Sequence, residues 1–229
     1  MPSYGYNVKK AVSEIMKTSI LSFIAVICLS TALHAQEPIR VACVGNSITY
    51  GHRLKNRSTE SYPSVLGEML GEKYEVRNFG ISARTLLNKG DHPYMKEQLF
   101  TEARAFHPDI VVIKLGTNDT KPHNWKYAQD FRHDLSALID SFRCEGSPRI
   151  YLCYPATVYG LRWGINDSTL VHGVIPAIKK TARKKKVRLI DLHTATQEMP
   201  ENFPDGVHPN AAGARILAEE VFKAITNKR

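Results

Sequence analysis

The sequence has little cysteine and no apolar segment of membrane-spanning length. Only four of its 229 residues are cysteine, and no two of them stand at the spacing of a metal site, which argues against a zinc module. The longest apolar stretch, residues 19–33, falls short of the roughly 20 residues that cross a bilayer. A stable membrane anchor is therefore not expected. The chain also contains no internal repeat and no low-complexity tract.

The first 35 residues have the layout of a secretory signal peptide. Three lysines precede the apolar stretch, which ends at Leu33-His34-Ala35 in the manner of a cleavage site. We therefore predict a signal peptide over residues 1–35 and an exported protein, periplasmic or extracellular. About 190 residues remain, which is enough for one well-buried domain over residues 36–229 and too few for two typical domains.

The three cysteines that follow residue 35 cannot all pair with one another. Cys43 and Cys153 lie inside apolar runs, whereas Cys144 does not. We interpret Cys43 and Cys153 as small buried hydrophobic residues, although export permits a disulfide.

The chain is basic, with 31 lysines and arginines against 22 acidic residues. The densest cluster, residues 183–186, could bind the phosphates of a nucleic acid, but it closes a predicted helix, where cations interact favourably with the helix dipole. We interpret it as a solvated helix end and predict no nucleic-acid partner. A basic surface would instead help the protein to meet acidic glycans or an anionic cell envelope.

Strand-like and helix-like segments alternate along the chain. This order predicts an α/β fold, a three-layer α/β/α sandwich whose five-stranded sheet is parallel and joined by right-handed crossovers. The apolar run 110–115 is typical of a buried parallel strand. The predicted strands are 39–44, 74–78, 110–115, 149–154 and 187–191, and the predicted helices are 62–70, 94–106, 125–142, 170–182 and 210–226.

Four short polar segments stand beside these elements and carry candidate chemistry. They are residues 45–48, 78–80, 116–119 and 205–208. The first three follow predicted strands, so they would converge at the carboxyl edge of one sheet, where open α/β sheets bind their ligands. The fourth precedes the last helix and would bring Asp205 and His208 to the same edge.

With Ser47, Gly80, Asn118 and His208 at four signature positions in the correct order, the chain after residue 38 resembles the SGNH hydrolases, also called GDSL-type esterases and lipases. The resemblance implies a flavodoxin-like fold, ester hydrolysis without a cofactor, and an oxyanion hole. The donors of that hole would be the backbone N–H groups of Ser47 and Gly80 and the side-chain amide of Asn118.

The segment around the serine departs from the family pattern. Asn46 and Ile48 flank Ser47, whereas the family usually has aspartate before the serine and leucine after it. Asparagine keeps a hydrogen-bond acceptor but loses the charge. The way in which this chain supports its nucleophile loop is therefore left open.

A serine hydroxyl needs a neighbouring base to become a nucleophile at neutral pH. His208 is the candidate base, because imidazole titrates near neutrality and can return the proton to a leaving alcohol. Asp205 would accept the other ring N–H of His208, which fixes the tautomer and raises the pKa of the histidine. We predict Ser-His-Asp catalysis through an acyl-enzyme.

Each of these positions has a structural alternative when taken singly. Ser47 could cap a helix, Gly116 could be a turn glycine, and Asp205 could belong to an ordinary turn. For Asp119 we prefer the interpretation as part of a helix cap. The other histidines show no pair at metal-ligand spacing, and we assign no metal.

The loop after Ser47, residues 50–57, is polar and basic, and no apolar lid for a long acyl chain is evident. Carbohydrate O-acetylesterases of the family fit such a loop, so we predict a short acyl group, acetyl first, on a glycan or small-molecule ester. Arg53 or Arg57 would then meet an acidic sugar. A sugar-stacking rim and local packing are equally open roles for four aromatic residues: Trp125, Tyr154, Tyr159 and Trp163.

Two other functions stay open. One is a lysophospholipase or thioesterase of the same family, which a series of acyl chain lengths would separate. The other is a non-catalytic glycan-binding protein on the same fold, which would not react with a serine-directed probe. The sequence leaves the sugar and the oligomeric state open.

Overall fold

The computed structural model describes residues 37–144 and 146–227, together with Glu14 and Met16. Apart from those two residues, the predicted signal peptide lies outside the described part of the chain. From Pro38 onward the chain forms one compact unit. No helix of the described residues is both long enough and apolar enough to cross a membrane.

The sheet has five parallel strands in the order β2-β1-β3-β4-β5. This is the doubly wound order in which ligands bind where the strand order reverses, here between β1 and β3. The predicted five-stranded parallel sheet is thereby confirmed. The strands are β1 (Ile39–Gly45), β2 (Tyr74–Gly80), β3 (Ile110–Lys114), β4 (Arg149–Tyr154) and β5 (Arg188–Asp191).

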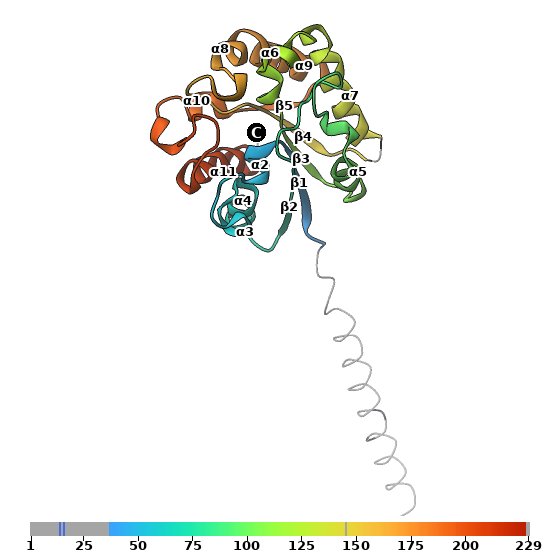
Figure 1. The fold of residues 1–229 in the computed structure, drawn as a ribbon. Helices are drawn as coiled ribbons and strands as arrows, with labels where there is room; N and C mark the ends of the chain where they lie inside the picture. Colours follow the sequence, from blue (N-terminus) through green and yellow to red (C-terminus); the bar gives the residue numbers. More distant parts are fainter. Residues whose placement is uncertain (1–13, 15, 17–36, 145, 228–229) are drawn as a thin grey trace, which may run out of the picture. The chain divides into compact units, whose positions relative to one another are not determined.

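Helices cover both faces of the sheet, as the three-layer prediction requires (Figure 1). One face carries α5 (Gln98–Ala105), α7 (Phe131–Arg143) and α9 (Ile175–Lys185), and the other carries α4 (Tyr62–Leu70) and α11 (Ala211–Thr226). Successive residues of β3 alternate between the two cores, because side chains of a strand point to opposite faces. Val111 and Ile113 join the first core, and Ile110 and Val112 join the second.

Short helices make up most of the connections. Two of them, α2 (Ser47–Tyr50) and η2 (Asn118–Thr120), follow the carboxyl ends of β1 and β3. The others are α3 (Arg57–Glu60), η1 (Tyr94–Lys96), α6 (Pro122–Trp125), η3 (Ala128–Asp130), η4 (Arg162–Gly164), α8 (Asp167–Thr169), η5 (Leu170–Val174), α10 (Leu192–Ala195) and η6 (Pro200–Asn202).

Three predicted helices are interrupted in the structure. The helix predicted over 94–106 breaks at Glu97, whose backbone is extended (φ −88°, ψ 147°) and whose carboxylate pairs with Arg84 at 2.9 Å. The helix predicted over 125–142 becomes regular only at Phe131. Pro176 is the second residue of α9, and the five residues before α9 form a π-helix, so the backbone stays helical through this segment while its hydrogen-bond pattern changes. The contact of Glu97 with Arg84 shows how a tertiary contact overrides a periodic pattern.

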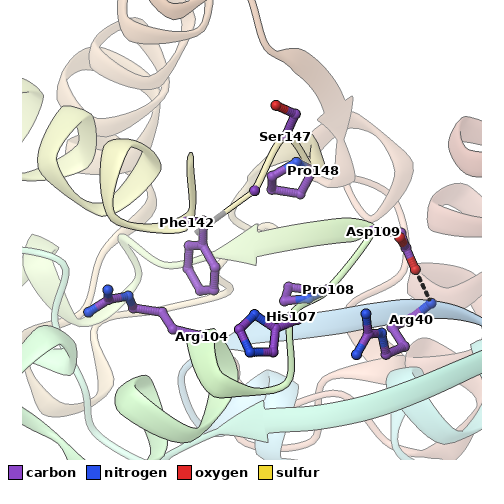
Figure 2. A pocket seen from close by; sticks show the side chains of 9 residues that line it. Arg40, Arg104, His107, Pro108, Asp109, Phe142, Ser147 and Pro148 are labelled. Carbon is purple, nitrogen blue, oxygen red and sulfur yellow. Dashed lines mark hydrogen bonds between the residues drawn. The ribbon is translucent and has the colours of Figure 1, made fainter. Parts of the chain in front are cut away.

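A hollow whose lining side chains are drawn in Figure 2 includes no residue of the four polar segments in its lining. It has a volume of about 250 Å³ and includes Arg40, Arg104 and His107 in its lining. Arg40 belongs to the start of β1, and the other two residues precede β3, so this hollow lies at the amino edge of the sheet. Its carboxylate, Asp109, accepts the backbone N–H of Arg40 at 2.8 Å.

Gly80 allows β2 to pass close beside α2. A β-carbon at this position would lie 2.3 Å from the backbone nitrogen of Tyr50. The neighbouring Asn78 fastens the same contact, because its side-chain amide donates to the Thr49 carbonyl at 2.8 Å. Because Gly80 has no side chain, β2 and α2 can lie this close together.

We expect Gly80→Ala to lower the free energy of unfolding by about 1–3 kcal/mol, the usual cost of overpacking, because backbone atoms have to move. Gly67→Ala is the matched control: it lies within α4, its added β-carbon would stand 3.5 Å from Val76, and alanine favours a helix over glycine by about 0.5–1 kcal/mol. Urea unfolding of both variants measures the difference. Equal midpoints for Gly80→Ala and wild type would contradict this account.

Candidate active site

The turn after β1 presents Ser47 at the carboxyl edge of the sheet. Asn46 caps α2, because its side-chain oxygen accepts the Ile48 N–H at 3.1 Å. Gly51, in the left-handed conformation with φ 88°, ends α2 after one turn. The predicted cap is thus made by Asn46, which leaves the Ser47 hydroxyl to other partners.

The turn before α11 brings an acid and an imidazole to Ser47. His208 Nε2 lies 2.8 Å from Ser47 Oγ, and His208 Nδ1 lies 2.9 Å from Asp205 Oδ2. The second carboxylate oxygen of Asp205 accepts the backbone N–H groups of Val207 and His208, at 2.9 and 2.7 Å. The structure therefore brings together the three residues that the sequence singled out for nucleophile, base and acid.

Gly206 explains why Asp205 and His208 can share one tight turn. Its φ of 78° lies in the left-handed region, and a β-carbon there would stand 2.2 Å from the Tyr159 carbonyl oxygen. Glycine meets both demands at little steric cost. Residues 205–206 therefore form a turn, as the structural alternative expected, and the same turn also brings the candidate acid and base together.

Burial sets the proton affinity of the histidine. Burial lowers the pKa of His208 below its ordinary value; the hydrogen bond and charge of Asp205 oppose this, and His52 and Lys114 reinforce it. Asp205 acts in the expected direction, but the expected net rise of the His208 pKa is wrong. A carboxylate alone would raise this pKa, but here desolvation and two further basic groups outweigh it.

Asp205 is held as a carboxylate. Burial would raise its pKa, but hydrogen bonds from the backbone and ring of His208 and from the Val207 N–H bring it below its ordinary value. Its side chain is only 3 % exposed. The group is therefore ionised at neutral pH and ready to accept from the Nδ1–H of His208.

The segment that leaves α2 folds back over this pair. The His52 ring packs edge-on against the His208 ring with centroids 4.7 Å apart, and Arg53 Nε lies 3.6 Å from Asp205 Oδ2. Arg57 instead donates to the Tyr50 carbonyl at 2.8 Å. Each arginine thus has a contact within the protein, and the expected role of Arg53 or Arg57 in meeting an acidic sugar stays a prediction. His52 was not among the predicted site residues.

The three expected oxyanion donors differ in their present partners. Ser47 is the first residue of α2, so its N–H has no intrahelical acceptor. The Gly80 N–H donates to Asn78 Oδ1 at 2.9 Å. The Asn118 amide donates one of its two hydrogens to the Arg84 carbonyl at 3.0 Å. Gly80 could serve an oxyanion only by sharing its N–H or releasing it from Asn78.

Asp119 holds a distant segment and does not cap a helix. Its two oxygens accept the backbone N–H groups of Leu86 and Leu87, at 3.1 and 2.8 Å. Burial raises its pKa to about 6. The helix-cap interpretation of Asp119 is therefore wrong, because the partners lie more than 30 residues away in sequence. Gly116, with φ 115°, is a turn glycine.

Lys114 lies beneath the nucleophile loop and was overlooked in the apolar run 110–115. Its side chain is 1 % exposed, and its Nζ lies 3.5 Å from Asn46 Oδ1. Burial lowers the pKa of this lysine to about 7. The sequence signal was present: a charged residue inside a buried strand is rare unless it has a partner.

A cleft of about 280 Å³ opens over Ser47 and His208. Trp163 forms one side, with its ring centroid 5.6 Å from that of His208 and a left-handed backbone (φ 56°), which is unusual for a bulky residue. The remaining lining residues are His52, Ser82, Ala83, Asn118, Lys121 and Ile165.

Of the four aromatic residues considered for a sugar-binding rim, Trp163 lines this cleft and is half exposed. Trp125 packs against Phe131 with ring centroids 5.7 Å apart. Tyr159 packs against Phe203 and donates its hydroxyl to the Thr196 carbonyl. Packing roles therefore account for Trp125 and Tyr159, and Tyr154 is buried.

Other predicted features of the sequence can be placed as well. Cys43 and Cys153 are buried and unpaired, as the apolar runs predicted, and Cys144 is exposed and unpaired. Over the described ranges, no group of three or more histidine, cysteine or acidic residues is placed to hold a metal ion.

Comparison with curated proteins identifies two relatives. The chain is 42% identical to an acetylxylan esterase of Xylanibacter ruminicola over 209 residues, which cover 83% of this chain and 44% of that protein. It is 28% identical to a multidomain esterase of Ruminococcus flavefaciens over 116 residues, or 48% of this chain and 14% of that protein. The chain thus spans less than half the length of the curated relatives that it matches.

Comparison with solved structures shows the shared fold. A carbohydrate acetylesterase from Sinorhizobium meliloti superposes with a TM-score of 0.67 at 19% identity, over 81% of this chain and 97% of the other. An aryl esterase from M. smegmatis gives the same TM-score at 21% identity, over 81% and 97%. An acetyl xylan esterase, AlAXEase, gives 0.60 at 22% identity, over 82% and 100%.

A family profile described as GDSL-like lipase/acylhydrolase matches residues 43–216. This range runs from within β1 into α11 and includes all four signature positions. With most of the chain inside the match, the protein belongs to the GDSL-like lipase/acylhydrolase family.

Proposed function

We propose that the protein is a carboxylic ester hydrolase in which Ser47, His208 and Asp205 carry out the reaction. The observation that carries this proposal is the continuous path of hydrogen bonds from Ser47 Oγ through the His208 ring to Asp205, at 2.8 and 2.9 Å, on the floor of a cleft. Such an arrangement activates a hydroxyl and stabilises the imidazolium that forms. The family membership supports the same chemistry.

In the first half of the reaction, Ser47 Oγ attacks the ester carbonyl carbon while its proton passes to His208 Nε2. The carbonyl oxygen becomes an oxyanion, which in this proposal the Asn118 amide and the Ser47 N–H stabilise, together with the Gly80 N–H once it leaves Asn78. The bond to the alcohol oxygen then breaks, and Nε2 returns the proton to that oxygen. An acyl group remains on Ser47.

In the second half, water takes the place of the alcohol. His208 Nε2 accepts a proton from the water as its oxygen attacks the acyl carbon, and the second oxyanion uses the same donors. Collapse breaks the bond to Ser47 Oγ, which receives the proton back from Nε2. The products are a carboxylic acid and the free enzyme, with every proton accounted for.

The substrate that we propose is a short acyl ester, acetyl first, on a carbohydrate. The cleft of about 280 Å³ leaves little room for a long chain beside an alcohol group. Trp163 offers a half-exposed aromatic face at the cleft. The acetylxylan esterase relative supports an acetylated plant polysaccharide. A polymer of this kind is met outside the cell, in agreement with the export predicted from residues 1–35.

The alternative is a lysophospholipase or thioesterase of the same family. That function needs an apolar channel for the acyl chain, because each buried methylene contributes only about 0.8 kcal/mol and only where apolar walls receive it. Of the cleft walls, Ile165 and Trp163 are the large apolar side chains, and Lys121 and His52 are polar. Acyl chain-length preference separates the two functions.

We expect Ser47→Ala and His208→Ala each to reduce kcat/KM for a soluble acetyl ester by at least about a thousandfold, with the double variant little worse than either, because nucleophile and base act as a unit. Asp205→Asn should cost less, since it keeps a hydrogen-bond partner for the ring. Steady-state kinetics on protein whose fold is verified by circular dichroism gives the ranking. Additive losses in the double variant would contradict the shared step.

We expect activity on a neutral ester to reach half its maximum below pH 6.5. The reaction requires neutral His208, and its pKa is lowered in the folded protein, so the active form persists to lower pH than with an unperturbed histidine. A profile of kcat/KM between about pH 5 and pH 8 measures this. A midpoint above pH 7 would show that Asp205 dominates instead.

We expect acetyl esters to be cleaved in preference to esters of roughly eight carbons, because a cleft of about 280 Å³ leaves little room for the longer chain beside the alcohol group. We also expect acetate release from acetylated xylan. Trp163→Ala should raise KM for the xylan roughly tenfold, and change KM for a small acetyl ester much less.

Leu161→Ala is the matched control, since Leu161 lies two residues away on the same segment, is 77% exposed and is not part of the cleft lining. Turnover that climbs with acyl length would favour the lipid or thioester function. Acetyl hydrolysis with no release from any acetylated glycan would reject the carbohydrate substrate and keep the esterase.

A further inference from the structure

Lys114 is a fully buried amine beside the reacting groups, and the proposed reaction does not use it. It is the last residue of β3 and stands opposite Gly45 of β1. Strand alternation puts it on the same face as Ile110 and Val112, whose core also contains residues of α4 and α11. Its position is therefore directly beneath the loop that carries Ser47.

The core on the Lys114 side of the sheet contains titratable groups from several elements, and these groups are neutral. Burial raises the thiol pKa of Cys43 on β1 and of Cys153 on β4, and it raises the phenol pKa of Tyr62 on α4. His208 lies above it, and the interactions described for Lys114 include no carboxylate. The charge of Lys114 therefore has no counter-ion among the described residues.

We propose that Lys114 is a positioning residue that holds Asn46 beneath the nucleophile and sets the pH range over which His208 is a neutral base. The inference rests on the Ser47–His208 chemistry proposed above. Asn46 Oδ1 lies 3.1 Å from the Ile48 nitrogen and 3.5 Å from Lys114 Nζ. One amide oxygen thus joins the first turn of α2 to the end of β3.

The charge of Lys114 acts on the histidine as well. A cation close to an imidazole disfavours the protonated ring, so Lys114 acts in the same direction as burial and against Asp205. Since the lysine itself has a pKa of about 7, its charge is present mainly below neutrality. Its effect is therefore greatest at the pH where His208 would otherwise be protonated and inactive.

This pairing gives a physical reason for the asparagine that departs from the family pattern. An aspartate at position 46 would form an ion pair with Lys114 and cancel most of its field at His208. Asparagine caps α2 equally well and leaves the lysine charge uncompensated. The proposed role of Asn46 therefore depends on Lys114, and the proposed role of Lys114 depends on Asn46.

Lys114→Met removes the amine and keeps an unbranched side chain in its place. We expect the acid limb of the pH profile to move up by roughly half a pH unit, a threefold change in proton affinity, because one of the groups opposing imidazolium is lost. The readout is the rate at which a fluorophosphonate labels Ser47 between about pH 5 and pH 8, since this reaction needs the base but no sugar.

Cys153→Ala is the matched control, because it alters the packing around the same amine without removing a charge. It should leave the acid limb in place.

Thermal melting adds a second readout. A lysine whose pKa is lowered on folding makes the folded state bind fewer protons than the unfolded chain, so stability rises with pH from about 7 to 10. Lys114→Met should lose this dependence.

Asn46→Asp tests whether the uncompensated charge of Lys114 lowers the pKa of His208, and it keeps both the lysine and the packing. It serves as the deciding test if Lys114→Met does not fold. The new carboxylate should pair with Lys114 and move the acid limb up. A limb that stays in place in Asn46→Asp, or that moves equally in Lys114→Met and Cys153→Ala, would overturn the inference. Wild-type protein that is not labelled at Ser47 would overturn the proposed function and this inference together, whereas labelled wild type with unmoved variants overturns the inference alone.

Discussion

The contact between Ser47 Oγ and His208 Nε2 is the interaction on which the proposed reaction depends. It joins residues 161 positions apart in the chain at 2.8 Å. A hydrogen bond of this kind is directional and tolerates little displacement, so both loops have to be fixed independently. The cap of Asn46 and the glycine contact with β2 fix one loop. The Asp205 carboxylate, which accepts two backbone N–H groups, fixes the other.

Around that contact, burial and the charge of Asp205 act on the pKa of His208 in opposite directions. Burial favours a neutral His208, Asp205 favours the imidazolium, and Lys114 and His52 restore the balance toward the neutral ring. A base has to be neutral before attack and charged afterwards, so an environment that strongly favoured either form would slow the reaction. The ionised carboxylate of Asp205 therefore opposes part of the shift that burial and the two basic groups cause.

The candidate site residues and the order of strands and helices could be predicted from the sequence. Strands and helices alternate along the chain, and each polar segment adjoins one of them. The pKa of His208, the partners of Asp119 and the helix break at Glu97 could not be predicted. All three depend on contacts made only after folding: burial of the ring, the N–H groups of Leu86 and Leu87, and the Arg84 side chain. Lys114 was missed because one charged residue among apolar neighbours hardly alters the pattern of a strand, although its burial is the feature that gives it a role.

The most direct test of the central claim is to locate the residue that a serine-directed reagent modifies. The protein is treated briefly with a fluorophosphonate at pH 7, and its intact mass and peptide masses are measured. A single adduct on Ser47, formed much more slowly in His208→Ala, is the result that the account predicts. An unmodified protein, or an adduct on another side chain, would contradict the claim that Ser47 is the nucleophile and His208 its base.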